Sequence, residues 1–381
     1  MIVAVNAIHA KGGGGTSYLK NILPVLGVRA RPGEAFRVIG RRGQEGLVAD
    51  CGPAVSFHEV NAPASTLGGL LWEQARLPGV VRRLGADVLF CPQNYIPLRG
   101  DTPSVLYLRN SLEAGRQARG LYQKAHWRAL GVLTRASLAR ASAVLAVSRT
   151  LAEEFGMPRG RHVTIVPHGI HSRFSPGPAG PHPMADRGAR SYFLFVSTVY
   201  RHKNLLGLVR GFAQVAGELP GHDLAIVGQV VDAGYEAEVR DAVRQAGLEE
   251  RVTWAGLATQ EQLPDWYRHA TALVFPSFAE SFGNPPLEAM ACGTPVLAAR
   301  AGAMPEVCGT GAAFFDPSRP DEIAALLRKV AGDPAFAREL SHRGVDWVSR
   351  YSWEAAADAV LGVLRGCLDP ATPGPENHRH A

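Results

Sequence analysis

Short apolar runs alternate with helical patterns along the first half of the chain. The runs are IVAVN at 2–6, ADVLFCP at 86–92, SVLYLRN at 104–110, SAVLAVS at 142–148 and VTIVPHGI at 163–170. Continuous apolar runs separated by helices are typical of strands buried on both faces of a parallel sheet. The first half therefore predicts a Rossmann-like α/β domain over residues 1–175.

The stretch that follows is rich in proline and glycine. It has four prolines and three glycines between Ser175 and Arg190, and it predicts an interdomain linker at 176–190. The alternation then restarts, with strands expected at 191–198, 223–228, 251–256 and 271–277 and helices expected at 204–217, 321–331 and 353–366. Thr259 and Gln262 have the spacing of a capping box.

The whole pattern predicts two Rossmann-like domains facing across a cleft. Parallel α/β sheets bind ligands at the carboxyl ends of their strands. The second domain is expected over 191–350, a C-terminal helix over 351–368 and a flexible tail over 369–381.

Two carboxylates stand eight positions apart in the stretch from Phe275 to Val296. Glu280 follows an apolar strand, and Glu288 is expected in the first turn of a helix that Pro285 and Pro286 open. A strand, a tight loop and a helix start direct backbone N–H groups toward an anion. A carboxylate there can bind the two hydroxyls of a ribose. The alternatives are a plain helix-start carboxylate for Glu288 and a solvated loop charge for Glu280.

The residues FGNPPLEAMACGTPV, together with the Glu-x7-Glu pair, AGAMPEV and FFDP, resemble the retaining glycosyltransferases of family 4. That family has the two-domain glycosyltransferase-B fold, and the resemblance runs from the glycine run at Gly12 to the helix after Trp353. It implies a donor site on the C-terminal domain. It also implies that the last helix packs back on the first domain.

Two cations, Arg201 and Lys203, lie between an expected strand and a helix that Asn204 would cap. Cations are disfavoured at a helix N-terminus unless an anion binds there, so the pair predicts a clamp for a diphosphate. Two solvated loop cations are the alternative. The resemblance implies that Lys203 neutralises the leaving nucleotide. Many relatives have glycine and arginine where this chain has Ser197 and Thr198, which makes Arg201 the expected partner of Lys203.

The resemblance also assigns the rest of the donor site. Glu280 would bind sugar hydroxyls and Glu288 the ribose. The remaining donor contacts are expected from Thr198, Ser281, Phe282, Gly283 and Asn284.

Residues of the first domain are expected on the acceptor side. The glycine run with Gly14, Gly15 and Thr16 is expected to form a loop between the first strand and the helical pattern YLKNILPVL. It lacks the acidic residue of a dinucleotide fingerprint. A purely structural turn is the alternative. Arg109 and Asn110 end another strand, where many relatives have His-Asp, so an obvious base is missing. His168 lies at the domain crossover, where a structural role is the alternative to ligand binding. The same two interpretations apply to His9 near the end of the first strand.

Composition and charge limit the binding partners and the cellular location that we expect for this chain. The net charge of +6 arises from a basic half through residue 175 and an acidic remainder. A basic half attracts phosphorylated acceptors or anionic lipid, whereas no nucleic-acid binding module accompanies it. The basic segment 115–141 is read either as a helix on an anionic membrane or as a solvated helix face. No apolar run is long enough to span a bilayer, and the first residues do not resemble a signal peptide. The five cysteines are scattered along the chain and predict no disulfide framework.

We therefore expect a cytoplasmic bacterial transferase, peripheral at the inner membrane face, with no metal site and no cofactor beyond its nucleotide-sugar co-substrate. No Asp-x-Asp occurs, and no His/Cys pair has zinc spacing. The expected reaction moves a hexosyl or amino-sugar unit, with UDP-sugar as first choice and GDP-mannose as second, to a sugar, lipid-linked or small natural-product acceptor. The alternatives are an epimerase or hydrolase of the same fold, a dinucleotide-dependent oxidoreductase and a non-catalytic nucleotide-binding protein.

Overall fold

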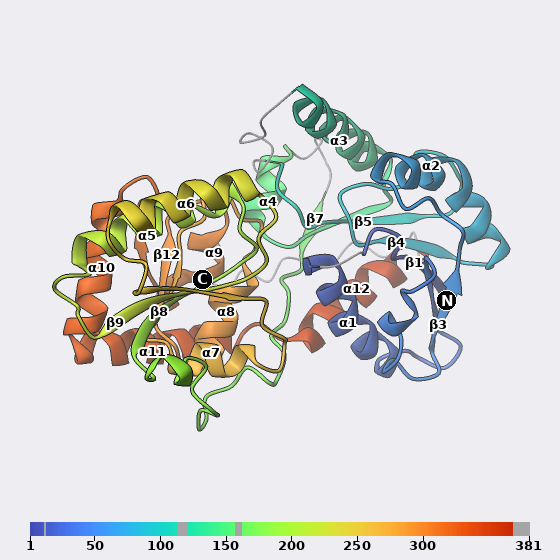
Figure 1. The fold of residues 1–381 in the computed structure, drawn as a ribbon. Helices are drawn as coiled ribbons and strands as arrows, with labels where there is room; N and C mark the ends of the chain where they lie inside the picture. The colour runs from blue at the N-terminus through green and yellow to red at the C-terminus, as the bar shows by residue number, and fades with distance from the viewer. Residues whose placement is uncertain (11–12, 113–120, 157–161, 369–381) are drawn as a thin grey trace. The chain divides into compact units, whose positions relative to one another are not determined.

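The computed structural model describes residues 1–10, 13–112, 121–156 and 162–368 (Figure 1). The chain divides into two compact units, residues 170–350 and the remainder. Each unit has one parallel sheet. The glycine Gly12, the start of the segment 115–141 and the expected tail 369–381 lie outside the described residues.

The first unit has a seven-stranded sheet in the order β3-β2-β1-β4-β5-β6-β7, and every pair is parallel. Its elements are β1 (Ile2–Asn6), α1 (Gly13–Val28), β2 (Ala35–Gly40), β3 (Val55–Glu59), α2 (Thr66–Arg83), β4 (Val88–Cys91), β5 (Ser104–Leu108), α3 (Leu121–Arg140), β6 (Ala143–Ala146), α4 (Arg149–Glu154), β7 (Val163–Ile165) and α12 (Trp353–Gly366).

The last helix, α12, belongs to the first unit and packs on α1. Arg365 donates two hydrogen bonds to Glu34, at 2.9 and 2.7 Å, and Arg29 donates one to Asp358 at 2.8 Å. The Trp353 ring lies 5.8 Å from that of Tyr18. These contacts join segments that are more than 300 positions apart in the sequence.

The glycine run does not form the loop that was expected. Gly14 and Gly15 lie in the first turn of α1, and the Thr16 hydroxyl donates to the carbonyl of Ala10 at 3.0 Å. Glycine weakens a helix interior more than its first turn, where the N–H groups have no helical partner. The expectation of a loop is therefore wrong for these residues.

The second unit has a six-stranded parallel sheet in the order β10-β9-β8-β11-β12-β13. Its elements are β8 (Ser191–Val196), α5 (Leu205–Val215), β9 (His222–Val227), α6 (Ala233–Gln245), β10 (Val252–Gly256), α7 (Leu263–His269), β11 (Ala272–Phe275), α8 (Asn284–Ala291), β12 (Val296–Ala299), α9 (Met304–Cys308), β13 (Ala312–Phe315), α10 (Pro320–Gly332) and α11 (Pro334–Val348).

The central strands of this sheet are buried along almost their whole length. All residues of β11 and β12 are buried, as are five of the six residues of β8, which is why their sequences read as continuous apolar runs. Phe193, Phe212 and Ile226 belong to one core with the inner faces of α5 and α10. Thr259 and Gln262 exchange the two hydrogen bonds of a capping box, at 2.9 and 3.3 Å, before α7.

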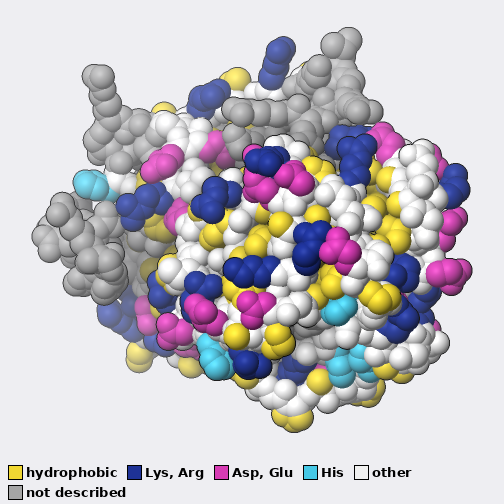
Figure 2. Space-filling model, turned by 90° about the vertical axis from the view of Figure 1, so that its left-hand side faces the viewer, with side chains coloured by type: hydrophobic (Ala, Val, Ile, Leu, Met, Phe, Trp, Pro, Cys, Tyr) yellow, Lys and Arg dark blue, Asp and Glu magenta, His cyan; other side chains and the backbone are white. Residues whose placement is uncertain are grey.

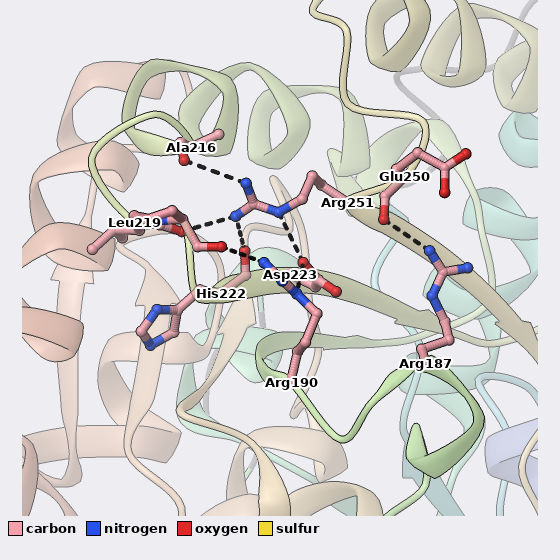
Figure 3. A network of polar contacts seen from close by, with 9 residues as sticks. Arg187, Arg190, Ala216, Leu219, His222, Asp223, Glu250 and Arg251 are labelled. Atoms are coloured by element: carbon pink, nitrogen blue, oxygen red, sulfur yellow. Dashed lines mark hydrogen bonds and ion pairs between the residues drawn. The ribbon is translucent and has the colours of Figure 1, made fainter.

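A buried carboxylate fixes the chain where it enters the second sheet (Figure 3). Asp223, near the start of β9, accepts hydrogen bonds from Arg190 at 3.1 Å and from Arg251 at 2.8 Å. Arg251 also donates to the carbonyl of Leu219 at 2.8 Å and to that of His222. The segment 176–190 lies within this unit, where Gly180 donates to Asp265 at 2.9 Å.

The face turned to the viewer in Figure 2 intersperses Lys and Arg with Asp and Glu, and its apolar side chains are scattered. Ion pairs such as Arg328–Glu218 and Arg240–Glu236 belong to the exterior of the second unit. Exposed pairs of this kind add little to stability.

Candidate functional site

Three loops of the second unit follow neighbouring strands at the carboxyl edge of its sheet. They leave β8, β11 and β12, and the reversal of strand order between β8 and β11 is where parallel α/β sheets bind ligands. The Phe278 N–H donates to the carbonyl of His202 at 2.8 Å, and the Ala303 N–H donates to that of Glu280 at 3.1 Å. Backbone hydrogen bonds thus tie the three loops together.

Glu280 and Lys203 meet across two of these loops. The Lys203 ammonium lies 2.5 Å from the Glu280 carboxylate, and the two side chains are only 15% and 12% exposed. The same ammonium lies 5.8 Å from the centre of the Phe275 ring. Glu280 is therefore paired with Lys203, not a solvated loop charge.

The loop after β12 shapes the backbone of Glu280. Gly302 has a φ of +54°, and a Cβ at this position would lie 2.8 Å from both the nitrogen and the oxygen of Glu280. Gly283 has a φ of +86° where the chain enters α8. Sequence analysis missed Gly302 as a site residue, although it lies in the AGAMPEV segment, because a single glycine does not reveal what its backbone approaches.

Glu288 lies in the middle of α8, because the helix already begins at Asn284, so the expectation of a first-turn carboxylate is wrong. It has a partner on α7. The Tyr267 hydroxyl donates to it at 2.7 Å, and the Tyr267 side chain is fully buried. Burial raises the pKa of Glu288 to about 7, an increase that the Tyr267 hydrogen bond and the Arg173 charge only partly offset. This carboxyl group therefore changes charge near neutral pH. Tyr267 was not predicted.

Arg201 lies in the same short turn as Lys203 but pairs with a different carboxylate. Its guanidinium donates to both carboxylate oxygens of Glu238 on α6, at 2.6 Å each, and stacks 4.7 Å above the ring of Tyr235. Asn204 caps α5 as expected, with its side chain accepting from the Gly207 N–H at 3.3 Å. The two cations of the predicted clamp thus have different carboxylate partners.

The other predicted donor residues lie on the same edge. Thr198 is half-buried in the loop after β8. Ser281, Gly283 and Asn284 are half-buried before and at the start of α8, and Phe282 is buried. The phenyl ring of Phe282 thus packs into the protein.

In the first unit, Arg109 contacts two of the other predicted acceptor-side residues, Gly14 and His168. Its guanidinium donates to the carbonyl of Gly14 at 2.6 Å, approaches His168 Nε2 at 3.4 Å and lies 4.2 Å above the Tyr18 ring. Burial lowers the pKa of Arg109. His168 is buried and stacks on Trp353, with ring centres 5.7 Å apart. The Asn110 N–H donates to Asn94 at 3.1 Å.

A second polar cluster of this unit was not predicted as a site. His9 Nε2 lies 3.0 Å from the fully buried carboxylate of Glu73, which accepts a hydrogen bond from Gln93 at 3.0 Å. His9 follows β1, and Gln93 follows β4, where the strand order of this sheet reverses. Only His9 carried a sequence signal, because Glu73 reads as an ordinary helix residue.

Among the described residues, no three His, Cys, Asp or Glu side chains are grouped so as to hold a metal ion. No helix in the described part of the chain combines the length and apolar character needed to cross a bilayer.

Comparison with known proteins finds a family match that falls mainly in the second unit. Residues 185–347 match the family model described as "Glycosyl transferases group 1". The D-inositol 3-phosphate glycosyltransferase of Nocardiopsis dassonvillei is 31% identical over 243 residues, which are 58% of this chain and 54% of that protein. The chain spans about half the length of the curated relatives that it matches.

Solved structures of the same fold extend over nearly the whole chain. Sucrose-phosphate synthase from Thermosynechococcus elongatus aligns with a TM-score of 0.79 at 20% identity, covering 97% of this chain and 100% of that one. The Anabaena HepE protein in complex with UDP-glucose aligns with a TM-score of 0.76 at 19% identity, covering 96% and 100%. The predicted fold class, two Rossmann-like α/β domains of the glycosyltransferase-B type, is confirmed, as is the resemblance to glycosyltransferases.

Proposed function

We propose that this chain is a retaining glycosyltransferase that moves a hexosyl or amino-sugar unit from a nucleotide sugar to an acceptor hydroxyl without a metal ion. The observation that carries the proposal is the arrangement of Glu288, Glu280 and Lys203 at the carboxyl edge of β8 and β11, within residues that match the group 1 glycosyltransferases. Ligands of parallel α/β folds bind at such an edge.

Each donor-site residue has a role that follows from its chemistry. Glu288, as a carboxylate, would accept hydrogen bonds from the two ribose hydroxyls. Lys203 and Arg201 would neutralise the diphosphate, and Glu280 would bind hydroxyls of the transferred sugar. Backbone N–H groups from Ser281 to Asn284, with Thr198 opposite them, would contact phosphate and sugar.

The transfer step breaks the bond between the anomeric carbon and the phosphate oxygen and forms one to the acceptor oxygen. The sugar passes through an oxocarbenium-like state, and the acceptor attacks from the face that the nucleotide leaves. The leaving phosphate takes the acceptor proton, so the step needs no side-chain base. The chain then contributes positioning and charge stabilisation.

UDP-linked sugars are the first choice of donor, because a protein of the same fold holds UDP-glucose. GDP-mannose is the second choice. The epimerase or hydrolase alternative and the oxidoreductase alternative are not favoured, since the matched family model and the named relative are glycosyltransferases.

The acceptor would bind the first unit around Arg109, Asn110, His168 and the first turn of α1. The acceptor classes are a sugar, a lipid-linked intermediate or a small natural product. Arg109 places a buried positive charge there, which suits an acceptor with an anionic or electron-rich group.

Cytoplasmic location with peripheral contact to the inner membrane face is part of the same proposal. On α3 the side chains of Arg128, Arg135 and Arg140 are exposed, and Val132 is 66% exposed. Basic and apolar side chains together favour anionic bilayer surfaces. Sedimentation with anionic vesicles but not with neutral ones would support this contact, and equal sedimentation with both would contradict it.

Calorimetric titration tests the donor site directly. UDP, GDP, ADP and NAD are added separately to the full chain, with and without EDTA. We expect UDP or GDP to bind equally well in both conditions and Glu288→Ala to abolish binding, while Glu339→Ala on the exposed side of α11 leaves it unchanged. Binding of NAD alone, or binding that EDTA removes, would overturn the proposal.

A further inference from the structure

Arg201 was predicted to bind a diphosphate together with Lys203, but in the structure its guanidinium is occupied by a carboxylate. Its two terminal nitrogens donate to the two oxygens of Glu238, both at 2.6 Å. Glu238 lies on α6, beside α5 (Figure 1). The two side chains are 25% and 43% exposed, so solvent reaches this pair more readily than the Lys203–Glu280 pair.

Tyr235 holds the guanidinium at the start of α5. The Arg201 guanidinium stacks 4.7 Å above its ring, and Tyr235 is only 2% exposed. The Tyr235 hydroxyl accepts a hydrogen bond from the Leu206 N–H at 3.0 Å, in the first turn of α5. The Tyr235 ring is thus a second contact of the Arg201 guanidinium beside its carboxylate partner.

A guanidinium fork binds a carboxylate and a phosphate through the same pair of parallel N–H groups. The terminal nitrogens of Arg201 that face Glu238 are thus the groups that a diphosphate would need. Of the other carboxylates near the start of α6, Glu236 pairs with Arg240 at 2.8 Å. Asp232 accepts from the Tyr235 N–H at 2.9 Å, and its charge raises the pKa of Arg201 less than Glu238 does.

We propose that Glu238 is a positioning residue that competes with the donor for Arg201. It neutralises the guanidinium while the site is empty and must release it when the diphosphate of a nucleotide sugar binds. This inference rests on the proposed function. It makes donor affinity depend on a residue that never touches the donor.

Replacing Glu238 by glutamine should change the affinity for UDP in a direction that distinguishes two roles of this residue. If Glu238 only anchored the loop, removing its charge would loosen Arg201 and weaken donor binding. If Glu238 competes, Glu238→Gln frees the fork and strengthens donor binding. Half-exposed ion pairs open at modest cost, so we expect UDP to bind about fivefold more tightly.

The experiment is a calorimetric titration of UDP into the full chain and four variants. Glu236→Gln is the matched control, because it removes the same charge from the same helix and leaves Arg201 with Glu238. Arg201→Gln and Arg201→Gln/Glu238→Gln complete a double-mutant cycle. We expect UDP affinity to rise with Glu238→Gln, to change less than twofold with Glu236→Gln, and to be insensitive to residue 238 once Arg201 is replaced.

Two results overturn the inference while the donor site stands. One is UDP affinity in Glu238→Gln that is equal to or lower than in Glu236→Gln. The other is a gain that persists without Arg201, which would show a general charge effect. A wild-type chain that binds neither UDP nor GDP overturns the proposed function itself, and with it the role of Glu238.

Discussion

The ammonium of Lys203 lies 2.5 Å from the carboxylate of Glu280, although 77 positions separate the two residues in the sequence. Both side chains are largely buried at the edge of the second sheet. Removing one partner of such a pair leaves the other charge buried without compensation. The two charges that would bind the donor therefore also stabilise the two loops that carry them.

We expect Lys203→Gln to lower the free energy of unfolding by about 2 kcal/mol. Adding Glu280→Gln should restore most of this loss, because no buried charge is then left unpaired, while UDP binding stays weak. Chemical denaturation and UDP titration of the wild type, both single variants and the double variant measure the two effects. A double variant as unstable as Lys203→Gln alone would contradict this account of the pair.

Gly302 is the residue whose replacement should move Glu280 without changing any charge. An added Cβ would lie 2.8 Å from two backbone atoms of Glu280, and the φ of +54° is unfavourable for alanine. We expect Gly302→Ala to cost about 1–3 kcal/mol of stability and to weaken UDP binding. Gly332→Ala is the control, because no atom lies within 4 Å of its added Cβ. Equal stability of the two variants would show that the loop accommodates the methyl group.

Much of the fold could be predicted because buried parallel strands leave continuous apolar runs in the sequence. The strands β1, β8, β9 and β11 were expected on that pattern. The strands β2, β3, β12 and β13 were not predicted, and neither was α11. Most side chains of β3 are not buried, and α11 buries only Leu340, Gly344 and Val348. The strands β12 and β13 have four residues each, and an apolar run this short does not by itself distinguish a strand from a helix segment.

The candidate site was predicted in its residue types but not in its pairings. Motif spacing placed Glu280, Arg201 and Lys203 on loops after strands and Glu288 in the helix that follows one of these loops. It could not show that Arg201 pairs with Glu238, since that contact depends on how α6 packs over α5. Tyr267 was not predicted for the same reason, because the sequence does not show which carboxylate a tyrosine on a helix will contact.

Asp223 offers a variant that should change stability without affecting the donor site. It is 1% exposed near the amino end of β9, whereas the site loops follow the carboxyl ends of the strands. We expect Asp223→Ala to lower the free energy of unfolding by about 3 kcal/mol, because two guanidinium groups lose their carboxylate. UDP affinity measured well below the unfolding temperature should stay at the wild-type value.

The control for Asp223 is Asp241→Ala, which removes an exposed carboxylate paired with Arg244. It should change stability by less than about 0.5 kcal/mol. Weaker UDP binding by folded Asp223→Ala would contradict this prediction. It would show that the Asp223 network also determines the conformation of the site loops.

The raised pKa of Glu288 predicts how stability depends on pH. The carboxyl group keeps its proton up to about pH 7 in the folded chain, whereas its ordinary pKa is 4.5. The folded state thus binds more protons between these values, so the contribution of Glu288 falls as pH rises and levels off above about pH 7. Relative to Glu288→Gln, the wild type should lose about 3 kcal/mol between pH 4.5 and pH 8. Urea denaturation across this range measures the difference, and parallel curves would contradict the shift.

The same titration should control donor binding. If Glu288 binds the ribose as a carboxylate, the site is competent only after the proton has left, and UDP-glucose is a suitable probe because its phosphates do not titrate near neutral pH. With a pKa of about 7, the dissociation constant should fall about tenfold from pH 6 to pH 8. Glu288→Gln should bind weakly with no such trend. Tyr267→Phe, which removes the donated hydrogen bond, should move the transition to higher pH. If the wild-type affinity stays constant across this range, the ribose is recognised by protonated Glu288 or by another residue.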